Sequence, residues 1–293
     1  SVEMIRLLLA TERPDAMIIF SDPRFFTHVF SMEDEIHQVC PLIYNHLWDA
    51  VPPPTFNRPF YDSCDLINCI NWPTYEFLHE WLPDRVNYVP HAVPAEIYFP
   101  MSDEDRLRAR RTLFGNSSDE RFIVLWVNRN ARRKRPNDVL VSWRMFLEAL
   151  PPAAREECML VMHTDARDPE GTDLPLVAEM EGVTRSVTFS SSRVGFEQMN
   201  MLYNSVDVTM NISHSEGFGL PTLEAMMAGC PIIANETGGL TRQVNGAEGE
   251  NGVALHPEVV TAVGSMGVCP HIYESYSSNE QIARALVKIH SMG

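Results

Sequence analysis

The chain has 293 residues, of which 45% are hydrophobic and 21% are charged, a composition typical of a folded globular protein rather than a disordered one. Its 39 acidic and 23 basic residues give a net charge of −16, which disfavours non-specific binding to nucleic acid. The longest apolar runs, such as Phe122–Val127, are much shorter than the roughly 20 residues of a membrane span, so we expect no transmembrane segment.

Short apolar runs alternate with amphipathic stretches along the whole chain. The runs predict strands at residues 16–20, 41–44, 65–70, 86–89, 122–127, 159–163, 186–189, 206–212, 231–234 and 252–255. Helical periodicity predicts helices at residues 137–150, 196–203, 221–228 and 279–290. Alternation of this kind is typical of parallel sheets with helices on both faces, an α/β fold.

A proline-containing segment at residues 94–101 marks the expected boundary between two domains. After it, Ser102 is a candidate helix cap, and Asp103, Glu104 and Asp105 suit the positive end of the helix dipole. The same residues read as D-x-D, a metal-binding signature in one class of sugar transferases, but we favour the capping interpretation and expect no metal.

The two expected domains differ in their number of strands. Six strands after the boundary suit a complete doubly wound domain, whereas four before it suit a domain that lacks its first βα units. We therefore expect a Rossmann-like domain at residues 1–98, a second at 99–275 and a C-terminal helix at 276–293.

The six cysteines form no C-x-x-C pair and show no metal-ligand spacing. Most of them lie in or beside apolar stretches, where a reduced cysteine behaves as a small hydrophobic residue. No secretory signal pattern opens the sequence. We therefore predict free thiols and a cytoplasmic location.

A glycine-containing loop at residues 213–219 follows a predicted strand and leads into a predicted helix that begins at Pro221. Such a loop offers backbone N–H groups and the positive end of a helix dipole to an anion. Glu216 precedes the two glycines, and we expect Glu224 in the first turn of the helix. Carboxylates on either side of an anion site could bind sugar hydroxyls, although an ordinary strand–helix turn with one capping acid would have the same residue types.

Basic residues cluster directly after the apolar strand 122–127. Five of the 23 basic residues lie within seven positions: Arg129, Arg132, Arg133, Lys134 and Arg135. In an acidic protein, such a cluster at the carboxyl end of a strand indicates an anionic ligand at the sheet crevice. A solvated charged loop or a localisation signal would also explain it.

In combination, these motifs resemble those of GT-B glycosyltransferases, specifically the retaining, nucleotide-sugar-dependent enzymes of family 4 (glycosyl transferases group 1). Glu216 and Glu224 match the E-x7-E motif of that family, and Arg129 and Lys134 match its diphosphate-binding pair. Residues 89–93 resemble the segment that enters the interdomain linker, and Gly238-Gly239 resembles a loop after the next strand. The resemblance covers roughly residues 86–256. It implies two Rossmann-like doubly wound domains facing a cleft, the N-terminal one incomplete.

The resemblance also implies roles for individual residues. Glu224 would bind the ribose of the donor nucleotide, Glu216 would contact the transferred hexose, and Arg129 and Lys134 would neutralise the leaving diphosphate without a metal. The remaining predicted donor contacts come from the same loop and helix: Gly217, Phe218, Gly219, Leu220 and Thr222. His46, after a predicted strand, resembles the histidine of the N-terminal domain that faces the sugar, so we count it with Arg129, Lys134 and Glu216 as a catalytic candidate.

These features predict a retaining glycosyltransferase that transfers a hexose from a nucleotide sugar and needs no further cofactor; the resemblance favours UDP. A sugar-nucleotide epimerase of the same fold and a non-catalytic nucleotide-binding GT-B module remain as alternatives. The acceptor stays open among a glycan, a lipid, a protein and a small glycoside, and the negative charge disfavours a modified nucleic acid.

Overall fold

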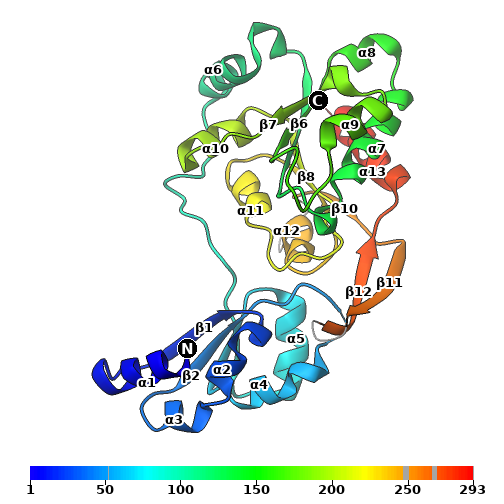
Figure 1. Cartoon of the computed structure of the whole chain (residues 1–293). Helices are drawn as coiled ribbons and strands as arrows, with labels where there is room; N and C mark the ends of the chain where they lie inside the picture. The colour runs from blue at the N-terminus through cyan, green and yellow to red at the C-terminus, as the bar shows by residue number, and fades with distance from the viewer. Residues whose placement is uncertain (52, 247–250, 266–268, 293) are drawn as a thin grey trace. The chain divides into compact units, whose positions relative to one another are not determined.

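The computed structural model describes residues 1–51, 53–246, 251–265 and 269–292 (Figure 1). The chain forms two compact α/β units. Unit 1 comprises Ser1–His91, Glu216–Phe218 and Thr261–Glu274, and unit 2 comprises Ala92–Ser215, Gly219–Val260 and Ser275–Gly293. Along the chain, unit 1 first gives way to unit 2 after His91, whereas the sequence predicts a domain boundary after residue 98. The domain limits given in the sequence analysis stay a prediction.

Unit 1 contains a sheet of four parallel strands in the order β1-β2-β3-β4. The strands are β1 (Met17–Ser21), β2 (Leu42–His46), β3 (Leu66–Cys69) and β4 (Val86–Tyr88). The helices are α1 (Val2–Thr11), α2 (Thr27–Phe30), α3 (Glu33–His37), α4 (Arg58–Asp62) and α5 (Trp72–Trp81), with 3-10 turns at Pro23–Phe26 and Thr55–Asn57. Leu42, Tyr44, Ile67 and Leu78 are fully buried in its core.

Unit 2 contains a sheet of six parallel strands in the order β10-β9-β8-β5-β6-β7. The strands are β5 (Phe122–Val127), β6 (Cys158–His163), β7 (Val187–Ser190), β8 (Val208–Asn211), β9 (Ile232–Asn235) and β10 (Gly252–Leu255). The order reverses between β5 and β8, which is the doubly wound arrangement, and ligands of such sheets bind at the carboxyl ends of the strands near this reversal.

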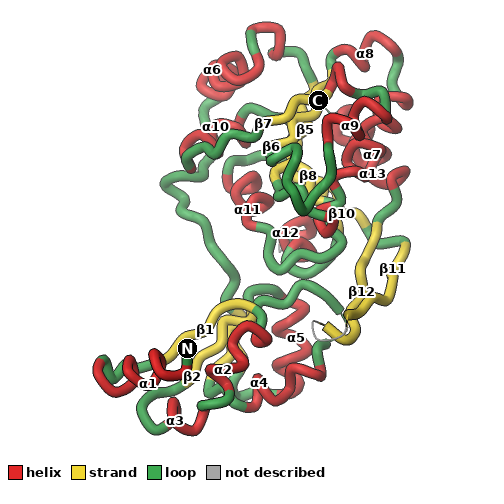
Figure 2. Tube along the Cα trace, in the orientation of Figure 1, coloured by secondary structure: helices red, strands yellow, loops and turns green. Residues whose placement is uncertain are grey.

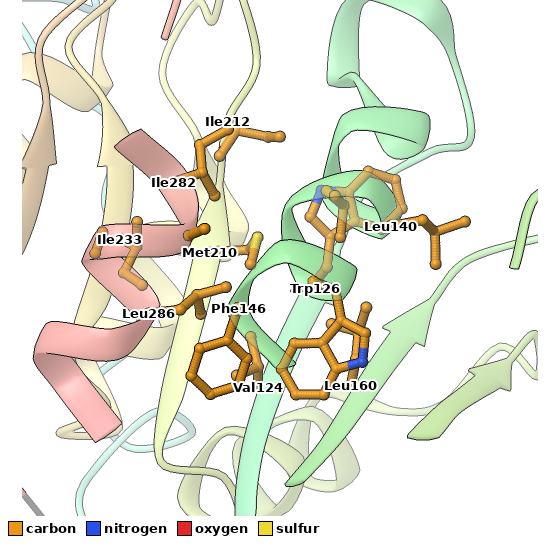
Figure 3. Packing of buried hydrophobic residues seen from close by; sticks show 14 of the residues in the cluster. Val124, Trp126, Leu140, Phe146, Leu160, Met210, Ile212, Ile233, Ile282 and Leu286 are labelled. Atoms are coloured by element: carbon orange, nitrogen blue, oxygen red, sulfur yellow. The ribbon is translucent and has the colours of Figure 1, made fainter. Parts of the chain in front are cut away.

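Helices cover both faces of the unit 2 sheet. They are α6 (Asp103–Phe114), α7 (Pro136–Ala149), α8 (Pro152–Glu156), α9 (Leu174–Met180), α10 (Phe196–Asn204), α11 (Leu220–Met227), α12 (Leu240–Asn245) and α13 (Asn279–His290), with 3-10 turns at Asn116–Ser118, Arg132–Lys134 and Thr184–Ser186. On one face, α7 and α13 pack against Val124 and Trp126 of β5 (Figure 3). On the other face, α10, α11 and α12 pack against Ile123 and Leu125. Because β5 is buried on both faces, its sequence is a continuous apolar run.

Each of the ten predicted strands is present, and their ends differ from the predicted ends by at most two residues. The four predicted helices correspond to α7, α10, α11 and α13, with ends that differ by at most one residue. The predicted cap of α6 is also confirmed, because Ser102 Oγ accepts a hydrogen bond from the Asp105 N–H at 3.2 Å. The D-x-D acids thus lie at a helix start, and Arg108 forms ion pairs with Glu104 and Asp105.

A two-stranded ribbon was not predicted. It consists of β11 (Val259–Ser265) and β12 (Cys269–Tyr276) and lies between β10 and α13 in the sequence (Figure 2). Thr261–Glu274 of this ribbon belongs to unit 1, where Tyr273 forms an isolated antiparallel bridge with Val51. Residues 259–265 and 269–276, for which the sequence analysis predicts no element, therefore form paired strands.

Candidate donor-binding site

The glycine loop enters α11 as the sequence predicts. Gly219 has φ +89° and ψ 58°, a left-handed conformation that glycine adopts without strain, and Pro221 follows in the first turn of α11. The helix begins at Leu220, so Glu224 lies just beyond the first turn and the prediction of a first-turn position is corrected. One helix turn therefore separates this carboxylate from the N–H groups at the start of α11.

Two tyrosines lie beside the Glu224 carboxylate. The Tyr203 hydroxyl, at the end of α10, donates a hydrogen bond of 2.7 Å to Glu224 Oε2. Burial, the charge of Glu224 and a side-chain hydrogen bond with Glu224 raise the pKa of Tyr98. The Tyr98 ring centroid lies 6.3 Å from that of Tyr203. The sequence analysis missed both residues, since nothing in their local sequence indicates a contact with a helix far along the chain.

The basic cluster separates into side chains with different surroundings. Arg129 is exposed and forms ion pairs with Asp168 (2.8 Å) and Glu170 (3.0 Å) in the segment that follows β6. Lys134 and Arg135 are buried. Arg135 adopts a left-handed φ of +55°, donates to Asp138 and to the Ser277 carbonyl, and stacks over the Tyr276 ring, so it stabilises the fold around the loop.

Two hydrogen bonds join the basic loop to the glycine loop within unit 2. The His214 N–H donates to the Arg133 carbonyl at 3.2 Å. The Arg133 guanidinium donates to the Ser215 carbonyl at 2.7 Å, one residue before Glu216. The two motifs that the sequence analysis found separately therefore meet at the carboxyl ends of β5 and β8. Arg133, which the sequence analysis names only as part of the basic cluster, takes part in both contacts.

Glu216, Gly217 and Phe218 belong to unit 1 and are described with it. The Asn71 side chain donates to the Gly217 carbonyl at 2.9 Å and to the Trp48 carbonyl at 2.6 Å. A side chain at Gly217 would put its Cβ only 2.7 Å from Leu47 Cδ1, so this position favours glycine. Glu224 belongs to unit 2, and a donor site shared by these residues stays a prediction.

The remaining predicted donor residues differ in exposure. Thr222 is buried, and its hydroxyl accepts a hydrogen bond from Asn211 Nδ2 at 3.2 Å, which ties α11 to the end of β8. Leu220 is 41% exposed at the start of α11. The Leu220 side chain is therefore accessible to a nucleotide-sugar donor, whereas the Thr222 side chain stabilises the junction between the loop and α11.

His46 is the last residue of β2, not a loop residue as expected, because the strand continues two residues beyond the predicted end. Its side chain is fully buried, with Nε2 2.8 Å from the Tyr61 hydroxyl, and burial lowers its pKa from 6.5 to about 3. Nδ1 is buried without a hydrogen-bond partner in the described part of the chain. The imidazole is therefore neutral near pH 7 and could act as a hydrogen-bonding group but not as a resident cation.

A cavity of about 1030 Å³ lies at the opposite edge of the unit 2 sheet. Phe122, Pro231 and Gly252, at or next to the amino ends of their strands, line it together with side chains of α6 and α13. None of the predicted donor residues lines this cavity. Within the described ranges, no group of three or more His, Cys, Asp or Glu residues is arranged to hold a metal ion, and no helix is long and apolar enough to cross a membrane.

Known proteins are similar to this chain in sequence and in fold. Residues 136–265 match the family model described as Glycosyl transferases group 1. The D-inositol 3-phosphate glycosyltransferase of Stackebrandtia nassauensis is 34% identical over 178 residues, which cover 59% of this chain and 38% of that protein. The enzyme of the same name from Acidothermus cellulolyticus is also 34% identical, over 176 residues that cover 59% of this chain and 37% of that protein. The matched region thus spans well under half the length of these relatives.

Solved structures show the same fold. Anabaena HepE in complex with UDP and glucose superposes with a TM-score of 0.68 at 16% identity, covering 98% of this chain and 71% of that one. Sucrose-phosphate synthase from Thermosynechococcus elongatus gives a TM-score of 0.70 at 16% identity, covering 99% of this chain and 68% of that one. The chain therefore has the GT-B fold, and its residues 136–265 are similar to the glycosyl transferases group 1 family.

Proposed function

We propose that this chain is the core of a retaining glycosyltransferase that transfers a hexose from a nucleotide sugar, with UDP as the favoured nucleotide. The observation that carries the proposal is the meeting of the basic loop with the glycine loop at the carboxyl edge of unit 2, through the Arg133 contact with Ser215. Two structures of Anabaena HepE support the choice of nucleotide, because one is a complex with UDP and glucose and the other is a complex with UDP-glucose.

In this proposal, the N–H groups at the start of α11 and the side chains of Arg129 and Lys134 bind the diphosphate. Negative charge on the diphosphate grows as the glycosidic bond breaks, so cationic groups held in place stabilise the transition state more than the bound donor. To bind the diphosphate, Arg129 would exchange its ion pairs with Asp168 and Glu170 for charge-assisted hydrogen bonds to phosphate oxygens.

Glu224 would bind the ribose, and Glu216 would bind the hexose. Retention of the anomeric configuration would follow from attack by the acceptor on the same face from which the diphosphate leaves. Such a reaction depends on positioning and charge stabilisation more than on a strong protein base. His46, neutral and buried, would act only as a hydrogen-bonding group.

The cationic pair would make a metal ion unnecessary, and we propose no cofactor beyond the donor itself. We also propose a reducing, cytoplasmic location, because all six cysteines are free thiols and five of them are buried. The acceptor is left open among a glycan, a lipid, a protein and a small glycoside.

A donor screen tests the function. The protein is incubated with UDP-, GDP- and ADP-sugars and a pool of glycan, lipid and glycoside acceptors, and mass spectrometry measures released nucleotide and glycosylated product. We expect one nucleotide class to be consumed, with an α-linked product from an α-linked donor. Isomerised donor without an acceptor would instead support an epimerase, and nucleotide binding without turnover would support a non-catalytic module.

A further inference from the structure

A buried phenol donates to the carboxylate of Glu224. Tyr203 has no exposed surface, and its hydroxyl lies 2.7 Å from Glu224 Oε2. Burial, together with the Glu224 charge, raises the pKa of Tyr203 well above its ordinary value. The hydroxyl therefore keeps its proton and acts as a donor to the carboxylate.

A second tyrosine approaches the same carboxylate from a different element. Tyr98 is only 2% exposed; burial, followed by the Glu224 charge and a side-chain hydrogen bond to it, raises its pKa. The segment that carries Tyr98 is fixed to α10, since the Phe99 N–H donates to Asn200 Oδ1 at 3.2 Å and the Met101 N–H donates to Asn204 Oδ1 at 2.8 Å. Both tyrosine side chains are therefore buried and fixed in position by the elements that carry them.

The geometry points to a positioning role: we propose that Tyr203, supported by Tyr98, fixes the orientation of the Glu224 carboxylate so that its remaining acceptor sites select a nucleotide that carries ribose hydroxyls. This inference rests on the proposed function and extends it to two residues and to a specificity. An ionised carboxylate has about four acceptor sites and no donor, and the two phenols use only part of that capacity. The remaining sites can accept hydrogen bonds from the hydroxyl groups of a ribose.

The positioning role predicts a coupling between the tyrosine and the ligand hydroxyls. If Tyr203 acts through Glu224, then Tyr203→Phe should weaken only the part of the affinity that the ribose hydroxyls contribute. A role in general folding would instead weaken the binding of all nucleotides alike.

The test measures by isothermal titration calorimetry the affinities for UDP, GDP and ADP, and then for the 2′,3′-dideoxy analogue of the tightest ligand. In the unaltered protein, the dideoxy analogue should bind roughly 10- to 150-fold more weakly, because it cannot donate to a charged acceptor. Tyr203→Phe should weaken the ribonucleotide by about 2- to 12-fold and leave the dideoxy analogue unchanged, because the lost hydrogen bond acts only on the orientation of Glu224. Tyr98→Phe should have a smaller effect in the same direction.

Tyr44→Phe is the matched control, because it removes an equally buried hydroxyl that donates to the Ser21 carbonyl at 2.8 Å in unit 1. It should change neither affinity. Equal weakening of both ligands by Tyr203→Phe would overturn the positioning role while leaving the donor site intact. Failure of the unaltered protein to bind any of the three nucleotides would instead contradict the proposed function and the positioning role together.

Discussion

The side chains proposed to hold the donor differ in how firmly the protein holds them. Lys134 is buried, and Glu224 accepts a hydrogen bond from Tyr203, whereas Arg129 is exposed and paired with acids that a diphosphate could replace. Two of the three thus have defined positions before a ligand binds, which lowers the entropy lost on binding.

The two glutamates should affect different parts of the donor. Glu224→Ala removes charge-assisted hydrogen bonds to the ribose, so the affinity for UDP should fall roughly 10- to 150-fold. Glu216→Ala should weaken UDP-glucose much more than UDP, because its proposed contact is with the hexose. Calorimetry with both ligands checks this, with Glu179→Ala on the exposed side of α9 as the control. Equal loss of UDP and UDP-glucose affinity in Glu216→Ala would contradict the assignment.

Burial of His46 predicts a pH dependence of stability. Its pKa is lowered from 6.5 to about 3 in the folded protein, so below pH 6.5 the unfolded chain binds a proton that the native state does not. The free energy of unfolding should therefore fall as the pH drops from about 6.5 toward 3, by up to about 1.4 kcal/mol per pH unit from this group. The check is the free energy of unfolding, measured with urea between about pH 7 and pH 5. It should change less with pH in His46→Gln than in the unaltered protein, and an equal change with pH in both would contradict the lowered pKa of His46.

At the scale of elements, the apolar pattern of the sequence predicts the parallel strands, because the strands of each sheet are largely buried. The ribbon β11–β12 was missed because Gly264 and Pro270 lie within its strands, and such residues usually argue against a strand. The structure gives the reason for the glycine: a Cβ at Gly264 would lie 2.3 Å from the Pro270 carbonyl oxygen. Local sequence could not show this close approach, just as it could not bring Tyr203 to Glu224 or Arg133 to Ser215.

Close strand contact also makes Gly252 a sensitive position. A Cβ there would lie 1.8 Å from the Ile232 carbonyl oxygen on the neighbouring strand β9, so Gly252→Ala must displace β10. Overpacking of this kind typically costs about 1–3 kcal/mol, which should lower the melting temperature measurably. Gly195→Ala, whose Cβ would meet nothing closer than 3.6 Å, should lower it much less. Equal melting temperatures for the two variants would contradict the predicted strain.

At the scale of the whole molecule, unit 2 accounts for most of the proposed donor site. Its sheet has the reversal of strand order at which doubly wound folds bind ligands, whereas the described strands of unit 1 run in sequential order. Arg129, Lys134, Gly219 and Glu224 all belong to unit 2. The motif spacing was sufficient to find this edge of the sheet, but the supporting contacts required the three-dimensional structure.

The most direct test of the account is the thermal stability of the protein with UDP, GDP or ADP in the presence of a chelator. We expect one nucleotide to stabilise the protein by about 2.7 kcal/mol at 100 times its dissociation constant, with the same shift whether or not the chelator is present. Arg129→Ala should reduce that shift, and Arg132→Ala, which the motif leaves outside the site, should preserve it. An unchanged melting temperature with all three nucleotides would contradict the donor site, and a shift that disappears with the chelator and returns with manganese would contradict its metal-independent chemistry.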